Sequence, residues 1–114
     1  MEPQLPVLAL KALDALSLRA EVTAQNIANA NTPGYRPLAV SFETALFRAA
    51  GEGEDALKAF KPSVGSAGTL FDSTSLRLDL ELQTASATAQ RYGAVLNILD
   101  REMQLQETAV TGGK

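Results

Sequence analysis

The chain has 114 residues, a net charge of −3, and neither cysteine nor histidine. This length suffices for one domain at most. The lack of cysteine excludes disulfides and thiolate metal sites, and the lack of histidine removes the commonest general base and metal ligand. A slightly acidic chain has no general electrostatic attraction for nucleic acid or an anionic membrane. Composition therefore argues against an enzyme, a cofactor-binding protein and a nucleic-acid-binding protein.

An apolar repeat with alternating spacings of four and three predicts a long helix over residues 6–30. The repeat consists of Ala9, Leu13, Leu16, Ala20, Thr23, Ile27 and Ala30. From Val22 to Tyr35 no residue is charged, although an exposed helix normally carries a charged outer face. We therefore expect this helix to make contacts on more than one side.

The segment Thr32-Pro33-Gly34-Tyr35 predicts a turn directly after this helix. Pro presets φ at the first central position of a type II turn, and Gly supplies the positive φ of the second. Asn31 is either a left-handed C-cap of the helix or a residue with a separate role. Asn26 and Asn29 lie three residues apart and share one helix face, where their amides would suit a neighbouring backbone better than water.

The middle of the chain has weaker signals. A short helix from Phe42 to Ala49 would be capped by Ser41, and one more helical turn could follow over residues 56–60. Residues 63–69 are rich in Gly and Ser and predict a flexible loop. The four phenylalanines either cap the ends of the helix pair or dock into adjacent subunits; they are Phe42, Phe47, Phe60 and Phe71.

A second long helix is predicted over residues 79–109. The alternation of leucines over residues 76–82 would suggest a strand by itself, but a heptad repeat from Leu78 to Val110 favours a helix. We expect an extended lead-in over residues 76–78 and an N-cap at Asp79. Asp79 and Glu81 are interpreted as acids of the helix start and not as a catalytic pair. Gly93, in the helix interior, would allow another backbone to approach beside Tyr92.

These elements predict an all-α fold, in which two long terminal helices pack as an antiparallel coiled-coil pair, with a loosely structured middle insert at the far end of the pair. The three parts are residues 1–35, 36–75 and 76–114. The helix pair would bury a seam of apolar and small side chains: Leu13, Leu16, Ala20, Ile27, Leu82, Ala85, Ala89, Leu96, Leu99 and Met103.

Two segments resemble a known family. Arg19-Ala20-Glu21 together with residues 26–35 is similar to the N-terminal signature of the bacterial flagellar axial proteins, the rod and hook family, and most similar to the FlgB type of basal-body rod protein. Residues 76–99, LRLDLELQ…RYGAVLNIL, resemble the C-terminal helix of that type. Asn31 stands where these proteins commonly carry Asp, and the middle of the chain is short for the family.

The resemblance implies a structural subunit of the proximal rod that assembles helically and transmits torque, without enzymatic activity. Its partners would be other rod proteins, copies of itself, and export-gate or rod–ring junction proteins, with no nucleic acid and no small-molecule substrate. Its location would be the periplasmic rod of the basal body, after type III export without a cleaved signal peptide. We expect the assembly interface to include Asn26, Ile27, Asn29, Asn31, Thr32, Pro33, Gly34, Tyr35, Tyr92 and Gly93.

Two alternatives remain at this point. Another flagellar rod or hook subunit would share the same signature. A soluble coiled-coil adaptor or secretion chaperone would keep the helices, but it would close into a discrete dimer or tetramer with a charged outer surface.

Overall fold

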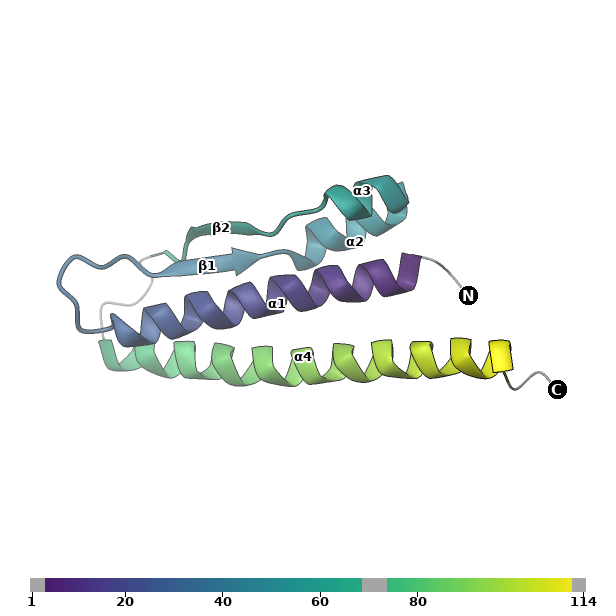
Figure 1. Ribbon diagram of the computed structural model, residues 1–114. Coiled ribbons are helices and arrows are strands. Elements are labelled where there is room, and N and C mark those ends of the chain that lie inside the picture. Colours follow the sequence, from purple (N-terminus) through teal and green to yellow (C-terminus); the bar gives the residue numbers. More distant parts are fainter. Residues whose placement is uncertain (1–3, 69–73, 112–114) are drawn as a thin grey trace.

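Two long helices lie side by side, and a small mixed insert packs on the first of them, on the side away from the second. The computed structural model describes residues 4–68 and 74–111, and the molecule measures 63 × 26 × 16 Å (Figure 1). Its elements in chain order are α1 (Gln4–Ala28), β1 (Leu38–Ser41), α2 (Glu43–Glu52), α3 (Glu54–Ala59), β2 (Ser63–Ser66) and α4 (Thr74–Thr111). The prediction of a mainly helical chain, with a long helix near each end and a small insert between them, is confirmed.

Helix α1 is the central element of the fold. It contacts α4 on one side and β1, α2 and α3 of the insert on the other (Figure 1). A helix between two partners needs apolar or small residues on more than one face. The absence of charge from Val22 to the end of α1 agrees with this position.

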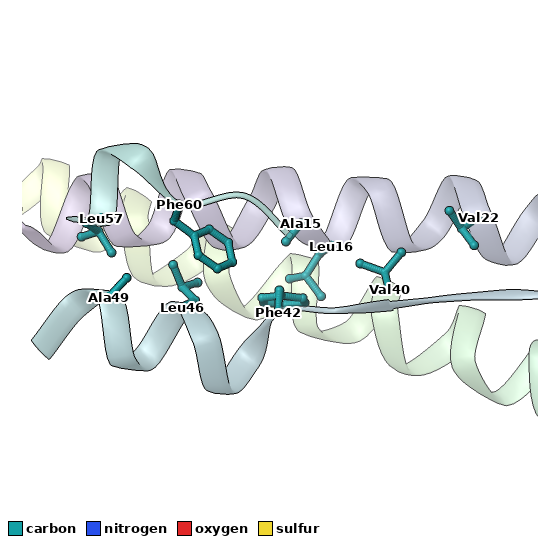
Figure 2. Packing of buried hydrophobic residues seen from close by; sticks show 9 residues of the cluster. All are labelled: Ala15, Leu16, Val22, Val40, Phe42, Leu46, Ala49, Leu57 and Phe60. Carbon is teal, nitrogen blue, oxygen red and sulfur yellow. The ribbon is translucent and has the colours of Figure 1, made fainter. Parts of the chain in front are cut away.

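The hydrophobic core lies between α1 and the insert (Figure 2). Its buried members come from α1, β1, α2 and the α3 region: Ala15, Leu16, Val22, Val40, Phe42, Leu46, Ala49, Leu57 and Phe60. From α4, Tyr92 and Val95 pack against this cluster while half-buried. The insert is therefore a packed layer of the protein, and the prediction of a loosely structured insert is wrong for residues 38–66.

The prediction of an all-α fold is also wrong, because the insert contains a two-stranded antiparallel sheet. Leu38 pairs with Ser66, and Val40 pairs with Val64. Residues 63–66 form strand β2 instead of the expected flexible loop. All four residues of β2 are exposed, so the strand has no buried face to give a period-two pattern. Backbone pairing with β1, which Val40 anchors in the core, holds β2 in place.

Several helix boundaries differ from the predictions. Helix α4 begins at Thr74, so residues 76–78 are helical instead of extended and Asp79 is not the N-cap. Helix α1 ends at Ala28 instead of Ala30. Ser41 belongs to β1, and α2 starts after Phe42 without a side-chain cap.

Two of the four phenylalanines, Phe42 and Phe60, are buried in the core, and this differs from both predicted roles. Phe47 is 83% exposed on α2. Phe71 lies outside the described residues.

We predict that Leu57→Ala destabilises the fold strongly. Leu57 has no exposed surface, and truncation of a fully buried leucine costs about 2–5 kcal/mol. Phe47→Ala removes a larger but exposed side chain, so its effect should stay within about 0.5 kcal/mol. Urea denaturation followed by circular dichroism measures both free energies of unfolding. Equal effects of the two variants would contradict a core between α1 and the insert.

Candidate assembly interface

Asn26 joins the end of α1 to three other parts of the chain. Its Nδ2 donates hydrogen bonds to the Leu38 carbonyl oxygen at 2.8 Å and to Glu81 Oε2 at 3.1 Å. Its Oδ1 accepts from the Leu38 backbone nitrogen at 3.1 Å and from the Tyr35 hydroxyl at 3.0 Å. These four bonds use the full capacity of a side-chain amide. Asn26 thus connects α1, the following turn, β1 and α4. As expected from the sequence, its amide hydrogen-bonds the backbone of a neighbouring segment, at Leu38.

The turn after α1 has the geometry expected from its sequence. The Tyr35 nitrogen donates to the Thr32 carbonyl oxygen at 3.2 Å, and Gly34 has a φ of 80°. That value fits the second central position of a type II turn, where Gly is favoured. Among the described residues no residue other than glycine has positive φ, so Asn31 is not a left-handed C-cap.

Asn29 hydrogen-bonds within its own segment. Its Nδ2 donates to the Gln25 carbonyl oxygen at 2.9 Å, and its Oδ1 accepts from the Thr32 hydroxyl at 3.1 Å. Asn29 therefore fixes the path of the chain as α1 ends. Asn26 and Asn29 are three residues apart, but only Asn26 reaches a neighbouring element.

The partner of Asn26 on α4 is a buried carboxylate. Glu81 is buried, and its Oε2 lies 3.7 Å from Arg77 Nη1, one helical turn earlier. Arg77 in turn donates to the Gly68 carbonyl oxygen at 2.7 Å. The cation and the amide compensate the cost of taking this carboxylate out of water. Glu81 is thus a structural contact between the helices, and not an exposed acid of the helix start.

A second polar cluster joins the middle of α1 to the insert and to α4. The Arg19 guanidinium binds both carboxylate oxygens of Glu43, at 2.6 and 2.8 Å, and donates to the Val40 carbonyl oxygen. It also lies 4.7 Å from the centre of the Phe42 ring. Arg91 on α4 reaches Glu43 Oε2 at 3.0 Å. The hydrogen bonds from Arg19 are the main reason why the pKa of Glu43 falls from 4.5 to about 2.

The heptad rows of α4 divide into buried and exposed ones. Toward α1 lie buried or half-buried side chains at spacings of four and three: Glu81, Ala85, Thr88, Tyr92, Val95, Leu99, Glu102 and Gln106. We name the adjacent row the α4 outer row; it consists of Leu82, Ala89, Leu96, Met103 and Val110. Its members Leu82, Leu96 and Met103 are 52, 43 and 58% exposed.

Only part of the predicted seam is buried between the two long helices. Leu13 and Leu16 are buried, while Ile27, Ala85 and Leu99 are half-buried. Ala20, Leu82, Ala89, Leu96 and Met103 are exposed, so in the single chain they do not lie buried between the helices. Of two neighbouring rows on α4, the prediction placed the more apolar one against α1. The structure instead buries the row that contains Glu81 and Thr88.

Beside the α4 outer row, the two long helices enclose an apolar groove with a volume of about 340 Å³. We name it the alanine groove, and its lining is Leu16, Ser17, Ala20, Ala24, Ile27, Ala85, Thr88, Ala89 and Tyr92. None of these residues is charged, and five have Ala or Ser side chains. Such a surface allows another helix to approach closely.

The remaining predicted interface residues lie mainly at the surface. Asn31, Thr32, Pro33 and Gly34 are exposed, and Tyr35 is half-buried. Gly93 is half-buried, and a Cβ built there would meet no atom within 4 Å, so no other backbone approaches it closely within the described chain. Asn26 is buried and cannot contact a neighbouring molecule directly.

The described residues show neither a metal site nor a membrane span. In residues 4–68 and 74–111, no group of three acidic, histidine or cysteine side chains could hold a metal ion. None of the helices there has the length and hydrophobicity needed to cross a membrane.

Part of this chain, including the segment with Asn26 and Tyr35, matches known proteins. Residues 8–36, which include most of α1 and the turn, match the family model described as flagella basal body rod protein. The segment thus carries the signature of a rod protein, and the resemblance read from the sequence is confirmed. The chain is similar to the flagellar basal body rod protein FlgB of Borrelia hermsii, with 52% identity over 42 residues. The matched part covers 37% of this chain and 31% of that relative.

We predict that Asn26→Asp destabilises the protein by about 3 kcal/mol. An ionised carboxylate cannot donate to the Leu38 carbonyl oxygen, and it places a second negative charge beside Glu81. Asn31→Asp is the matched control, because Asn31 is exposed and its change should stay within about 0.5 kcal/mol. Urea unfolding at neutral pH measures both variants. A tolerated Asn26→Asp would show that the amide network does not hold the helices together.

The Glu43 ion pair predicts a pH-dependent contribution to stability. Because the folded-state pKa is lowered to about 2, the contribution is present above pH 4.5 and disappears as the pH falls toward 2. Solvent screening of this half-exposed carboxylate limits the contribution to about 1 kcal/mol. Urea midpoints of the parent chain and Glu43→Gln should therefore differ at pH 6 and converge near pH 2. In an Arg19→Gln background the difference at pH 6 should shrink, and an unchanged difference would rule out Arg19 as its cause.

Proposed function

We propose that this chain is a structural subunit of the proximal rod of the bacterial flagellar basal body. The observation that supports this most directly is the rod-protein signature over residues 8–36, which coincides with the helix and turn that organise the fold. The chain would assemble with other rod proteins and with copies of itself in the periplasm. Export-gate or rod–ring junction proteins would contact the proximal end.

The fold supports a mechanical and non-enzymatic role. Glu43 connects Arg19 of α1 with Arg91 of α4, and Asn26 connects the end of α1 with β1 and α4. A force applied to one long helix is therefore transferred to the other through fixed polar contacts as well as through packing. In the rod, torque would pass from one folded subunit to the next through their packed outer faces.

We propose further that α1 and α4 form an antiparallel coiled-coil pair. Asn26, near the end of α1, hydrogen-bonds Glu81, near the start of α4. Ala12 and Leu16, nearer the start of α1, line a common groove with Ala94 and Val95, farther along α4. The alternating spacing of the buried row on α4 supports packing of the coiled-coil type.

The assembly contacts would use the α4 outer row and the alanine groove. Both surfaces are apolar or uncharged, and the apolar side chains of the α4 outer row recur once per heptad, which suits a neighbouring helix. The turn residues Asn31, Thr32, Pro33 and Gly34 are exposed at one end of the molecule, where an axial neighbour could contact them. Helical assembly requires contacts of this kind that do not close on themselves.

The direct test is to locate the protein in cells. In the bacterium that encodes this chain, deletion of its gene should abolish motility, and a labelled copy should restore it. Electron cryo-tomography should then place the label at the inner-membrane end of the rod. A motile deletion strain, or a label elsewhere in the cell, would contradict the proposal.

We predict that Ala24→Lys blocks assembly without unfolding the chain. Ala24 is exposed and lines the alanine groove, and a lysine there would have to be buried when a neighbouring helix covers the groove. Ala59→Lys is the matched control, because Ala59 is exposed at the end of α3, outside the groove. Swimming assays should show loss of motility for Ala24→Lys alone, with equal helicity of both purified variants by circular dichroism. Full motility of Ala24→Lys would exclude the groove from the assembly interface.

A further inference from the structure

The two flanks of α4 differ in shape. On one flank the α4 outer row borders the alanine groove. The opposite flank carries Arg91, which reaches toward α2, and one and two heptads later it carries Ile98 and Leu105. Ile98 and Leu105 are 53 and 58% exposed, and they line a shallow hollow together with Asn97, Arg101 and Glu102. We name Ile98 and Leu105 the apolar knobs.

We propose that the alanine groove of one copy of this chain receives the apolar knobs of a second copy. This contact rests on the proposed function, because a rod subunit must meet other copies or relatives. It adds the identity of the occupant and the side chains that enter the groove.

The dimensions of the two surfaces match. The groove follows α1 from Leu16 to Ile27, a distance of roughly 16 Å at 1.5 Å per residue. The knobs are one heptad apart, which is roughly 10 Å on the same scale. Both knobs therefore fit within the length of one groove, where small side chains leave room for large ones.

The charges beside the two surfaces are complementary. On α1 the exposed acids Asp14 and Glu21 lie three and four residues from Ser17 of the groove. On α4 the exposed Arg101 lies three residues after Ile98 and four before Leu105. Residues at these spacings are neighbours on a helix surface. When the knobs enter the groove, Arg101 can reach the acidic rim, whereas the half-buried Glu102 of the same hollow belongs to the row that faces α1. The pairing of Arg101 with the rim favours a second copy over an unrelated apolar helix.

The contact would be heterologous, because groove and knobs lie on opposite flanks of α4. A heterologous contact leaves one groove and one pair of knobs free after each addition, so it produces open chains, or rings where the rotation closes, instead of two-fold dimers. This is the kind of contact that a helical filament requires.

Cysteine cross-linking tests the contact directly, because the natural chain contains no cysteine. Purified Ala24→Cys and Leu105→Cys chains are mixed at high concentration and oxidised. We expect cross-linked heterodimers to exceed both homodimers, and a chain with both substitutions to give a ladder of multimers. Ser86→Cys, exposed on α4 outside both surfaces, replaces Ala24→Cys in the control and should give no enrichment of heterodimers.

Three results would overturn the proposal: no heterodimer enrichment over the control, predominant Ala24→Cys homodimers, or a monomeric chain at every concentration in sedimentation. None of them affects the proposed function, because the label would still mark the rod in cells if a different rod protein filled the groove. Conversely, a cross-linked ladder from a chain that is not found in the rod would support self-docking and refute the rod function.

A charge exchange tests the rim. Arg101→Glu should weaken self-association roughly twofold to fivefold, the effect expected of an exposed ion pair. Adding Glu21→Lys to the same chain should restore association, and Glu21→Lys alone should weaken it. Sedimentation equilibrium measures the three association constants. If the double variant associates no better than either single variant, Arg101 does not face the acidic rim.

Discussion

The fold depends on one side-chain amide whose four hydrogen bonds are all made within the chain. Asn26 is buried at the end of α1, where it fixes Leu38, Tyr35 and Glu81 at once. Without it, the backbone of β1 and the carboxylate of Glu81 would each lose a partner in a place that water hardly reaches. The positions of the turn, the sheet and the start of α4 therefore all depend on the asparagine at position 26 of α1.

The sequence predicts features that arise from local chemistry. The turn at Pro33 and Gly34 follows from the φ values that these residues favour, and the two long helices follow from heptad repeats. The sequence does not predict the two strands, because β2 has no buried side chain and is held by backbone pairing alone. The contacts of Glu81 with Asn26 and of Glu43 with Arg19 join residues 55 and 24 positions apart. Such partners become visible only when the chain has folded.

The error in the seam has an informative cause. A hydrophobic repeat marks the rows of a helix that avoid water, but it does not say which neighbour covers each row. On α4 the row facing α1 includes Glu81, Thr88 and Glu102, whereas the α4 outer row is apolar throughout. The more hydrophobic row thus remains at the surface of the single chain. This distribution would be unfavourable for a protein that worked alone in water.

The same distribution separates folding from assembly. The core between α1 and the insert, together with the polar contacts at Asn26 and Arg19, stabilises the single chain without use of the α4 outer row. Leu82, Leu96 and Met103 therefore keep their apolar surface exposed in the single chain, and in the proposed assembly the free energy of burying it would contribute to association instead of folding. In the proposed rod, a chain built in this way would fold before it meets its neighbours and would still gain most from helix packing once assembled.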